Sequence, residues 1–297
     1  MNSNLSNLTI NILTYKTDKE ILKNCIKSID KSIAINIIEN SNKFENKDYL
    51  SDLNYNINII CTGNNLGYSG GHNYGISKVK TRYVLILNPD LICLEGYFEK
   101  IQKYLNDNVN FNIIGCQYQK DKMNKPAYGL FNYKGYNPKI SEDKYNLQSV
   151  DWVVGCSMLI DLDKFSNKNI FDENFFLFYE ETDLCRNVKS SGGNIFSSKD
   201  LIIDHYGEKG SFATVPDKKY SYLKLRNWHL MWSSFYYYKK NYSYNYAFKL
   251  LIGQLIKSFI KFIFFGLLLN KYNYTKHLFR FLGLINSMLG KKSWFRV

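Results

Sequence analysis

The chain has 297 residues, of which 45% are hydrophobic, so it can form one large domain or a domain with an appendage around a sizeable core. Its six cysteines are widely spaced and include no C-x-x-C pair, which argues against structural zinc and a disulfide framework and predicts a reducing cytoplasm. The first eight residues contain neither a basic nor an apolar stretch, so we expect no secretory signal.

The formal net charge of +13 is concentrated at the end of the chain. The last acidic residue is Asp217, and the 80 residues after it carry 15 Lys and Arg. The first 217 residues carry 24 basic and 26 acidic side chains, so they are nearly neutral. The charge therefore predicts a domain over residues 1–217 and a cationic region over 218–297, which should meet different surroundings.

Strand-like and helix-like segments alternate through the first part of the chain. The spacing of apolar residues predicts strands at 8–14, 34–39, 56–61, 83–87 and 111–118, and helices at 19–33, 70–80 and 95–108. This alternation predicts an α/β fold with a largely parallel sheet and helices on both faces. Residues 119–148 lack any such pattern, and a loop of that length in a compact domain is usually functional or mobile.

Shorter elements are predicted beyond this loop. Apolar runs indicate strands at 150–160, 195–197 and 201–204. A short helix is expected at 180–190, ended by Gly192 and Gly193, and an aromatic helix at 220–240.

Two further helices, at 247–269 and 276–290, are apolar but interrupted by basic residues. Lys249, Lys257 and Lys261 fall within one half of the helix circumference, and Leu, Ile and Phe fill most of the other half. Because these charges interrupt the roughly 20 apolar residues of a spanning helix, we favour a helix lying in the membrane interface. Contact with anionic lipid through residues 246–292 would explain the missing acids. The alternative is that these helices pack on the main domain with exposed lysines.

The strand predicted at 83–87 ends in Asn88, Pro89 and Asp90. Proline stops the strand because it lacks an N–H and holds the preceding residue extended. Ligands of open α/β sheets bind outside the carboxyl ends of the strands. An acid there suits a divalent cation bound to a phosphorylated substrate. The alternative is that Asp90 simply opens a turn.

A glycine-rich segment runs from Asn65 to Gly75. Glycines allow the backbone to approach a ligand closely, and the helix that follows offers its N-terminus to an anion. The segment is neither a G-x-G-x-x-G fingerprint nor a P-loop. An ordinary strand-to-helix connection is the alternative.

Three carboxylates, Glu180, Glu181 and Asp183, follow an aromatic run at 175–179. Apolar surroundings and like charges raise the pKa of a carboxyl group, which suits a general base. The alternative is that they complement a helix dipole and that Asp183 pairs with Arg186. We expect both roles, divided among the three residues. His205 ends an apolar run, and the small residues at 207, 210 and 211 favour a ligand role for it.

In this order, the motifs resemble family 2 glycosyltransferases of the GT-A fold, particularly a rhamnosyltransferase-like bacterial branch. The resemblance runs from about residue 9 to residue 240, and seven separated motifs in family order make it specific as a set. The motifs are Thr14-Tyr15, Glu39-Asn40-Ser41, residues 65–75, residues 87–90, Asp151-Trp152 with Gly155, residues 171–186, and His205.

The resemblance implies an inverting, metal-dependent transfer of a sugar, with rhamnose a candidate, from a nucleotide diphosphate donor. The donor would be UDP- or dTDP-linked, and the acceptor a hydroxyl of a saccharide or lipid-linked saccharide in surface polysaccharide synthesis. A donor half at about 1–90 and an acceptor half at about 91–217 would precede the basic helices. The enzyme would act on the inner face of the cytoplasmic membrane. Nucleic acid is not expected as a partner, because the basic residues alternate with apolar ones at helical spacing.

The resemblance also implies roles for individual residues. Asp90 and His205 would bind Mg²⁺ or Mn²⁺ across the diphosphate, and Asn88 occupies the first position of the family's D-x-D element. Asp151 and Trp152 would lie at the acceptor or sugar site, with core packing as the alternative for Trp152. The residues implied around the nucleotide sugar are Thr14, Tyr15, Glu39, Asn65, Gly71, Asn73 and Asn88.

The base position departs from the family pattern, because the usual Glu-Asp is Glu180-Glu181 in this chain. Glu181 therefore stands where the family places its base, one methylene longer than Asp, and a misplacement of about 1 Å can cost on the order of 100-fold in rate. Asp183 is the alternative base. A second reading of the whole chain is a non-catalytic sugar-nucleotide or glycan-binding protein on a degenerate GT-A scaffold. Glu39 in place of Asp, and Lys16 in place of Asn, are two smaller departures.

Overall fold

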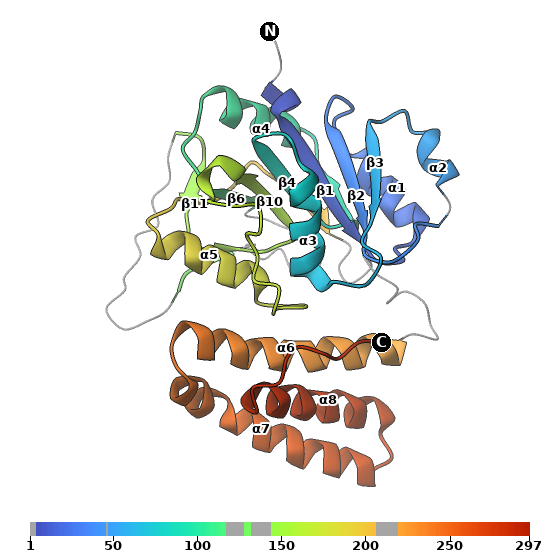
Figure 1. Ribbon diagram of the computed structural model, residues 1–297, viewed down its shortest axis with the longest axis vertical. Helices are drawn as coiled ribbons and strands as arrows, with labels where there is room; N and C mark the ends of the chain where they lie inside the picture. The colour runs from blue at the N-terminus through green and yellow to red at the C-terminus, as the bar shows by residue number, and fades with distance from the viewer. Residues whose placement is uncertain (1–3, 46, 117–127, 132–143, 206–218) are drawn as a thin grey trace. The chain divides into compact units, whose positions relative to one another are not determined.

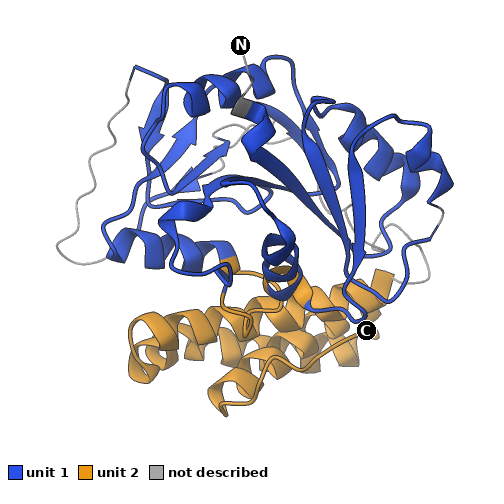
Figure 2. Cartoon of the chain, turned by 45° about the horizontal axis from the view of Figure 1, so that its top comes forward, with its two compact units in different colours: residues 1–66, 70–171, 181–211 blue, residues 67–69, 172–180, 212–297 orange. Residues whose placement is uncertain are grey.

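A computed structural model of the protein describes residues 4–45, 47–116, 128–131, 144–205 and 219–297. They form two compact units (Figure 2). The first comprises Met1–Leu66, Gly70–Phe171 and Glu181–Ser211, and the second comprises Gly67–Ser69, Asp172–Glu180 and Phe212–Val297. The boundary expected between residues 217 and 218, and most of the loop expected at 119–148, lie outside the described residues.

The first unit is built on an eight-stranded sheet with the order β3-β2-β1-β4-β10-β6-β11-β8 (Figure 1). Neighbours among β1 to β4 are parallel, as are β6 and β11, whereas β10 runs antiparallel to β4 and β6 and β8 runs antiparallel to β11. The predicted α/β fold with a largely parallel sheet is confirmed. The strands are β1 Leu8–Thr14, β2 Ala34–Glu39, β3 Ile57–Cys61, β4 Tyr83–Leu87, β6 Ile113–Cys116, β8 Leu147–Ser149, β10 Ser157–Asp161 and β11 Ile195–Ser198.

Two short antiparallel ribbons accompany this sheet. One joins β5 (Leu91–Cys93) to β12 (Ile203–His205), and the other joins β7 (Tyr128–Gly129) to β9 (Trp152–Val153). The single strand predicted at 150–160 is therefore wrong. A turn at Gly155 and Cys156 separates β9 from β10, and the two strands belong to different sheets.

Helices lie on both faces of the large sheet. α1 (Lys19–Lys27) and α4 (Tyr97–Asn106) bury their apolar sides in one core with Ile10 and Ile12 of β1. α3 (Gly67–Lys78) lies on the opposite face, against Leu13 and Ile38. The remaining elements of this part of the chain are α2 Asp48–Ser51, α5 Glu180–Ser190, and 3₁₀ turns at Asn4–Asn7 and Leu162–Lys164.

α1 is shorter than the helix predicted at 19–33, because it ends in a cap of its own. The Ser28 hydroxyl donates to the Cys25 carbonyl at 2.7 Å, and the Asp30 carboxylate accepts from the N–H and hydroxyl of Ser32 at 2.8 and 2.6 Å. Short polar side chains that bond to nearby backbone compete with a continuing helix.

The register of the parallel strands brings their carboxyl ends to one edge. Thr14 lies opposite Glu39, Glu39 lies opposite Cys61, and Ile12 lies opposite Leu87. The residues that follow β1, β2, β3 and β4 therefore gather at one edge of the sheet, where open α/β sheets bind their ligands.

The second unit contains α6 (Lys219–Asn241), α7 (Tyr244–Leu267) and α8 (Lys271–Met288), shown in orange to red in Figure 1. Their shared core contains Met231, Phe235, Ala247, Leu251 and Leu284. Among the described residues, α7 is the one helix that is long and apolar enough to cross a membrane by length and composition.

A matched pair of glycine substitutions tests the packing of α8 on α6. A Cβ at Gly283 would lie 2.1 Å from the Trp228 carbonyl oxygen, whereas a Cβ at Gly253 of α7 meets nothing within 4 Å. Gly283→Ala should therefore destabilise the unit by roughly 1–3 kcal/mol, the usual cost of overpacking. Gly253→Ala should stabilise it by about 0.5–1 kcal/mol, because alanine favours helix. Denaturant unfolding of both variants measures this, and equal effects would contradict the described packing.

Candidate functional site

A buried carboxylate lies at the carboxyl edge of β1 and β2. Glu39 is 2% exposed, and it accepts hydrogen bonds from the Thr14 hydroxyl at 2.7 Å, the Ser41 hydroxyl at 2.6 Å and the Lys16 N–H at 3.3 Å. Three donors offset the cost of burying this charge. The residues predicted to hold base and ribose, with the half-buried Tyr15 between Thr14 and Lys16, thus form one preorganised group.

Asn40 ties the glycine-rich segment to this group. Its backbone N–H donates to the Thr14 carbonyl at 2.8 Å. Its side-chain oxygen accepts from the Leu66 N–H at 2.9 Å, and its side-chain amide donates to the Asn65 side chain at 3.1 Å. Asn65 is therefore held beside the carboxyl edge. This role of Asn40 was not predicted, although its position directly after a strand rich in apolar residues was a signal for it.

Two glycines of this segment, Gly71 and Gly75, face the sheet. A Cβ at Gly71 would lie 2.5 Å from a methyl carbon of Leu13, and one at Gly75 would lie 2.7 Å from Ile38. Asn73 is also used internally, since its side chain accepts from the Phe171 N–H at 3.0 Å and donates to the Phe171 carbonyl at 2.9 Å. In this structure the segment brings α3 close to β1 and β2, and a nucleotide contact by Gly71 or Asn73 stays a prediction.

Asp90 and His205 lie side by side, although 115 residues separate them in the chain. The pairing of β5 with β12 places His205 opposite Leu91, and the His205 Nε2 atom lies 3.6 Å from the Asp90 Oδ1 atom. Asp90 is 3% exposed. The Cys25 thiol lies close by, and burial, together with the negative charge of Asp90, raises its pKa to about 12. The sequence contains no signal for this neighbour, because only the packing of α1 brings Cys25 close to Asp90.

The pair has the donor types of a cation site. Within the described ranges, no group of three or more His, Cys, Asp and Glu could hold a metal ion. One carboxylate and one imidazole leave several positions of a divalent cation open, and oxygens of a diphosphate and water commonly fill such positions for Mg²⁺. The residues fit a cation shared with a phosphorylated ligand. Asn88 lies just before them, with its backbone N–H donating to the Cys156 carbonyl at 2.9 Å.

The two candidate bases on α5 differ in accessibility. Glu181 is half-buried, and burial raises the pKa of its carboxyl group, against the lowering effect of the N–H groups of Glu181 and Thr182. Asp183 is 1% exposed and accepts from Asn187 on the same helix at 3.4 Å. A base must reach its proton donor, so the geometry favours Glu181. Burial, and to a smaller extent the charge of Glu181, raises the pKa of Cys185 to about 12, and a hydrogen bond with the backbone of Val153 in β9 opposes this shift.

Asp151 is buried, whereas its neighbour Trp152 is half-buried. Asp151 is 1% exposed; it accepts from the Phe131 N–H at 2.8 Å, and its other oxygen lies 3.8 Å from the Lys189 ammonium. This supports a structural role. The half-buried Trp152 indole covers Gly129, where a Cβ would lie 2.4 Å away. The Trp152 ring can pack here because Gly129 has no side chain.

The aromatic run before Glu180 is anchored on α6 within the second unit. The Ser233 hydroxyl donates to the Leu177 carbonyl at 2.8 Å, Phe176 stacks on His229 at 4.6 Å, and Tyr179 lies 5.1 Å from Tyr237. The sequence analysis did not foresee this anchoring, although the aromatic composition of α6 was a signal.

The two residues at the end of that run have strained backbones. Phe178 and Tyr179 have φ values of 70° and 69°, in the left-handed region that costs L-residues on the order of 1–2 kcal/mol each. Such strain is often found at functional sites, and here it directly precedes Glu180 and Glu181.

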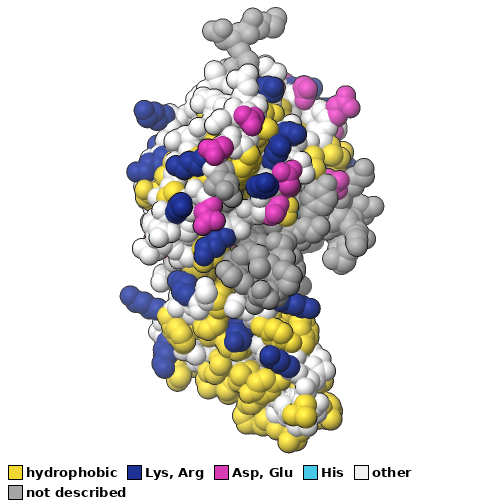
Figure 3. Space-filling model, turned by 90° about the vertical axis from the view of Figure 1, so that its right-hand side faces the viewer, with side chains coloured by type: hydrophobic (Ala, Val, Ile, Leu, Met, Phe, Trp, Pro, Cys, Tyr) yellow, Lys and Arg dark blue, Asp and Glu magenta, His cyan; other side chains and the backbone are white. Residues whose placement is uncertain are grey.

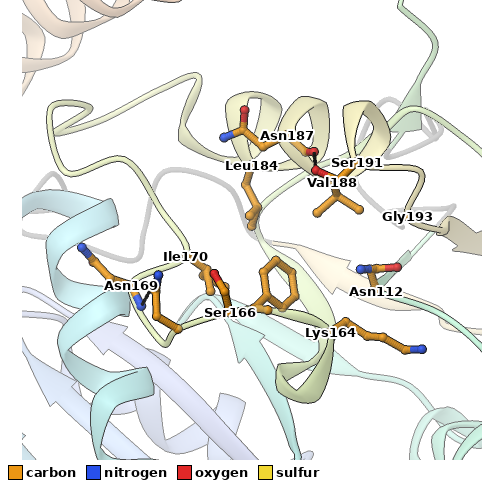
Figure 4. A pocket seen from close by; sticks show the side chains of 12 residues that line it. Asn112, Lys164, Ser166, Asn169, Ile170, Leu184, Asn187, Val188, Ser191 and Gly193 are labelled. Carbon is orange, nitrogen blue, oxygen red and sulfur yellow. Dashed lines mark hydrogen bonds between the residues drawn. The ribbon is translucent and has the colours of Figure 1, made fainter.

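A pocket of about 320 Å³ lies between α5 and residues 164–170 (Figure 4). Its lining is rich in amides, and it includes none of the residues that the sequence analysis assigned to a site. The lining residues are Asn112, Lys164, Phe165, Ser166, Asn167, Asn169, Ile170, Leu184, Asn187, Val188, Ser191 and Gly193.

Comparison with known proteins gives three results. A family model described as Glycosyl transferase family 2 matches residues 9–165. The low-salt glycan biosynthesis hexosyltransferase Agl10 of Haloferax volcanii is 28% identical over 234 residues, covering 75% of this chain and 74% of that one. The rhamnosyltransferase WbbL of Escherichia coli is 23% identical over 189 residues, covering 57% of this chain and 69% of its own.

The fold has a solved counterpart. The crystal structure of GalNAc-T7 with UDP, GalNAc and Mn²⁺ matches with a TM-score of 0.53 and 12% identity. The match covers 74% of this chain but half of that one. At this identity the likeness shows the fold alone, and it confirms the GT-A architecture.

Proposed function

Because this chain belongs to glycosyl transferase family 2 and is therefore a glycosyltransferase, we propose that it moves a hexosyl group, rhamnosyl among the candidates, from a nucleotide diphosphate donor to a hydroxyl, with inversion. The observation that carries the proposal is the Asp90–His205 pair, 3.6 Å apart. It lies directly after β4, at the carboxyl edge that the Thr14–Glu39 group shares. Relatives named as a hexosyltransferase and a rhamnosyltransferase support the sugar class.

The donor's nucleoside would bind at the edge of β1 and β2. Glu39 would accept hydrogen bonds from the ribose or base, with Thr14 and Ser41 fixing its orientation. A half-buried ring at Tyr15 can stack on a base. The UDP in the GalNAc-T7 structure supports a UDP- or dTDP-linked donor.

Asp90 and His205 would hold Mg²⁺ or Mn²⁺ beside the diphosphate, as the Mn²⁺ in the GalNAc-T7 structure supports. When bound, the cation neutralises the charge that develops on the departing diphosphate. Asn88 has no charge, so Asp90 would be the one carboxylate of this strand end to contact the cation.

Glu181 would accept the proton of the acceptor hydroxyl as its oxygen attacks the anomeric carbon. A raised pKa increases the basicity of a carboxylate and brings it nearer to the operating pH. Trp152 would stack on the acceptor or sugar, close to Glu181 through Val153 and Cys185.

The acceptor would be a saccharide or lipid-linked saccharide of a surface polysaccharide, handled at the inner face of the cytoplasmic membrane. Peripheral contact with the membrane through α7 and α8 would suit this location. α7 exposes Ile256, Ile260 and Phe264 by 53%, 59% and 53%, and no acid follows Asp217. In Figure 3, hydrophobic side chains gather over the lower helices with Lys and Arg among them.

A thermal-shift screen of UDP-, dTDP- and GDP-sugars with and without Mn²⁺ tests the proposal. We expect one donor to raise the melting temperature only when Mn²⁺ is present. The same donor should release its nucleotide when a saccharide acceptor is added. Stabilisation by a donor with no release of nucleotide, across a panel of acceptors, would instead identify a sugar-nucleotide-binding protein.

A further inference from the structure

A basic pocket lies between α7 and α8 of the second unit. It has a volume of about 260 Å³ and includes four cationic side chains. The lining residues are Gln254, Lys257, Ser258, Lys261, Phe265, Asn273, Lys276, His277 and Arg280. It is independent of the donor site, whose residues all belong to the first unit.

No acid among the described residues balances the charges of the pocket. Among the described residues, none of the four cations is paired with a carboxylate, and no acid follows Asp217 in the chain. Arg280 donates from Nε to the Asn227 side chain at 2.8 Å, which fixes its guanidinium at the pocket without neutralising it. Partial burial and then the charges of Arg280 and Lys261 lower the pKa of Lys276. Four positive charges held close together favour the binding of an anion.

His277 gives a second, independent indication of a ligand. Its side chain is 8% exposed, its ring stacks on Phe265 at 5.8 Å, and its Nδ1 atom has no hydrogen-bond partner among the described residues. A buried polar atom left without a partner costs on the order of 1–3 kcal/mol. An oxygen of a bound anion would remove that cost, because a neutral imidazole that carries its proton on Nδ1 can donate to it.

The surroundings of the pocket indicate what carries the anion. At about 100° per residue, Phe264 and Ile260 lie about 20° and 60° around α7 from Lys257. Both are about half exposed, and Leu267 is 80% exposed. A cationic pocket bordered by an exposed apolar face matches a ligand with a charged head and an apolar tail.

We propose that this pocket binds the terminal phosphate, monoester or diphosphate, of a membrane lipid. Four cations exceed the single negative charge of a phosphodiester, so a headgroup with two or more charges fits better. The inference rests on the proposed peripheral contact of α7 and α8 with the membrane, and it adds selection of one headgroup chemistry to that contact.

Vesicle co-sedimentation of the full chain tests the pocket. The vesicles are phosphatidylcholine alone, phosphatidylcholine with phosphatidic acid, and phosphatidylcholine with phosphatidylglycerol, the last two at matched surface charge. We expect about tenfold tighter binding to phosphatidic acid than to phosphatidylglycerol. The pocket variant Lys261→Gln/Lys276→Gln should lose this preference. The control Lys249→Gln/Lys292→Gln removes the same charge outside the pocket and should keep it.

Three outcomes would overturn the proposal. Equal binding to both anionic vesicles, with the two double variants weakened alike, would agree with membrane contact but contradict selection of a headgroup by the pocket. No binding to any vesicle would contradict both the membrane contact and the lipid-binding role of the pocket. A thermal shift with inorganic phosphate that the pocket variant abolishes, without a vesicle preference, would assign the pocket to a soluble phosphate. Circular dichroism confirms that each variant folds; if the double pocket variant does not, Lys261→Gln alone is compared with Lys249→Gln.

Discussion

Glu181→Gln is expected to lower kcat by about 10³-fold while leaving KM for the donor nearly unchanged, within the 10²–10⁴-fold range of general-base contributions. The amide keeps the size and position of the side chain but cannot accept the proton of the acceptor hydroxyl. Initial rates of nucleotide release, at saturating donor and acceptor, measure the effect. Glu173→Gln, at an exposed position in the preceding segment, is the control and should leave kcat within about twofold of the native value, as surface substitutions usually do.

The pH dependence separates Glu181 from Asp183. Burial raises the pKa of Glu181, and only the deprotonated carboxylate can act as base. Activity should therefore fall as the pH drops through this raised pKa, at a higher pH than for an ordinary glutamate. Glu181→Gln should remove that acidic limb from the residual rate. If Asp183→Asn removes the limb and Glu181→Gln leaves it, Asp183 is the base.

Asp90→Asn should lower the rate of sugar transfer by about 10²–10³-fold, because it removes the single carboxylate proposed to contact the cation, an electrostatic contribution of that order. It should also raise the Mn²⁺ concentration needed for half-maximal donor-induced thermal shift. Titration of Mn²⁺ at fixed donor measures this separately from catalysis. His205→Ala should act in the same direction with a smaller effect, since the carboxylate remains.

Asp163→Asn is the matched control for Asp90. Asp163 forms a surface ion pair with Arg82 at 3.4 Å and is 68% exposed, so its loss should change neither quantity. If Asp90→Asn transfers sugar at the native rate with the native Mn²⁺ requirement, Asp90 is a turn residue, as the sequence alone allowed.

The strands buried on both faces were predictable from the sequence. β1, β2 and β4 have the predicted bounds, because each is rich in apolar residues and the apolar pattern stops directly after it. α5 was predictable for the same reason, since Gly192 closes it. The local pattern of apolar residues was sufficient to predict these elements, because their bounds do not depend on which distant segments they pair with.

Pairing between distant segments could not be predicted in this way. Residues 150–160 form one apolar run, yet β9 pairs with β7 while β10 enters the large sheet. The apolar pattern of residues 150–160 would be the same for one long strand and for two strands in different sheets. Likewise, the residues around Asp90 and His205 indicated two candidate ligands and the resemblance implied a shared cation, but their 3.6 Å separation depends on the pairing of β5 with β12. The contacts of Gly71 with Leu13 and of Asn73 with Phe171 also depend on packing between segments that are distant in the chain.

Strand β10 also determines the order in which the sheet can assemble. β1, β2, β3 and β4 pair with one another, so residues 8–87 contain every partner that this half needs. β6 pairs only with β10 and β11 among the described strands, and both follow it in the chain. During synthesis the first half of the sheet can form early, whereas β6 can pair only after the 40 residues between it and β10 have been added. Closing long loops slows folding, so we expect the first half to become protected from hydrogen exchange before the second.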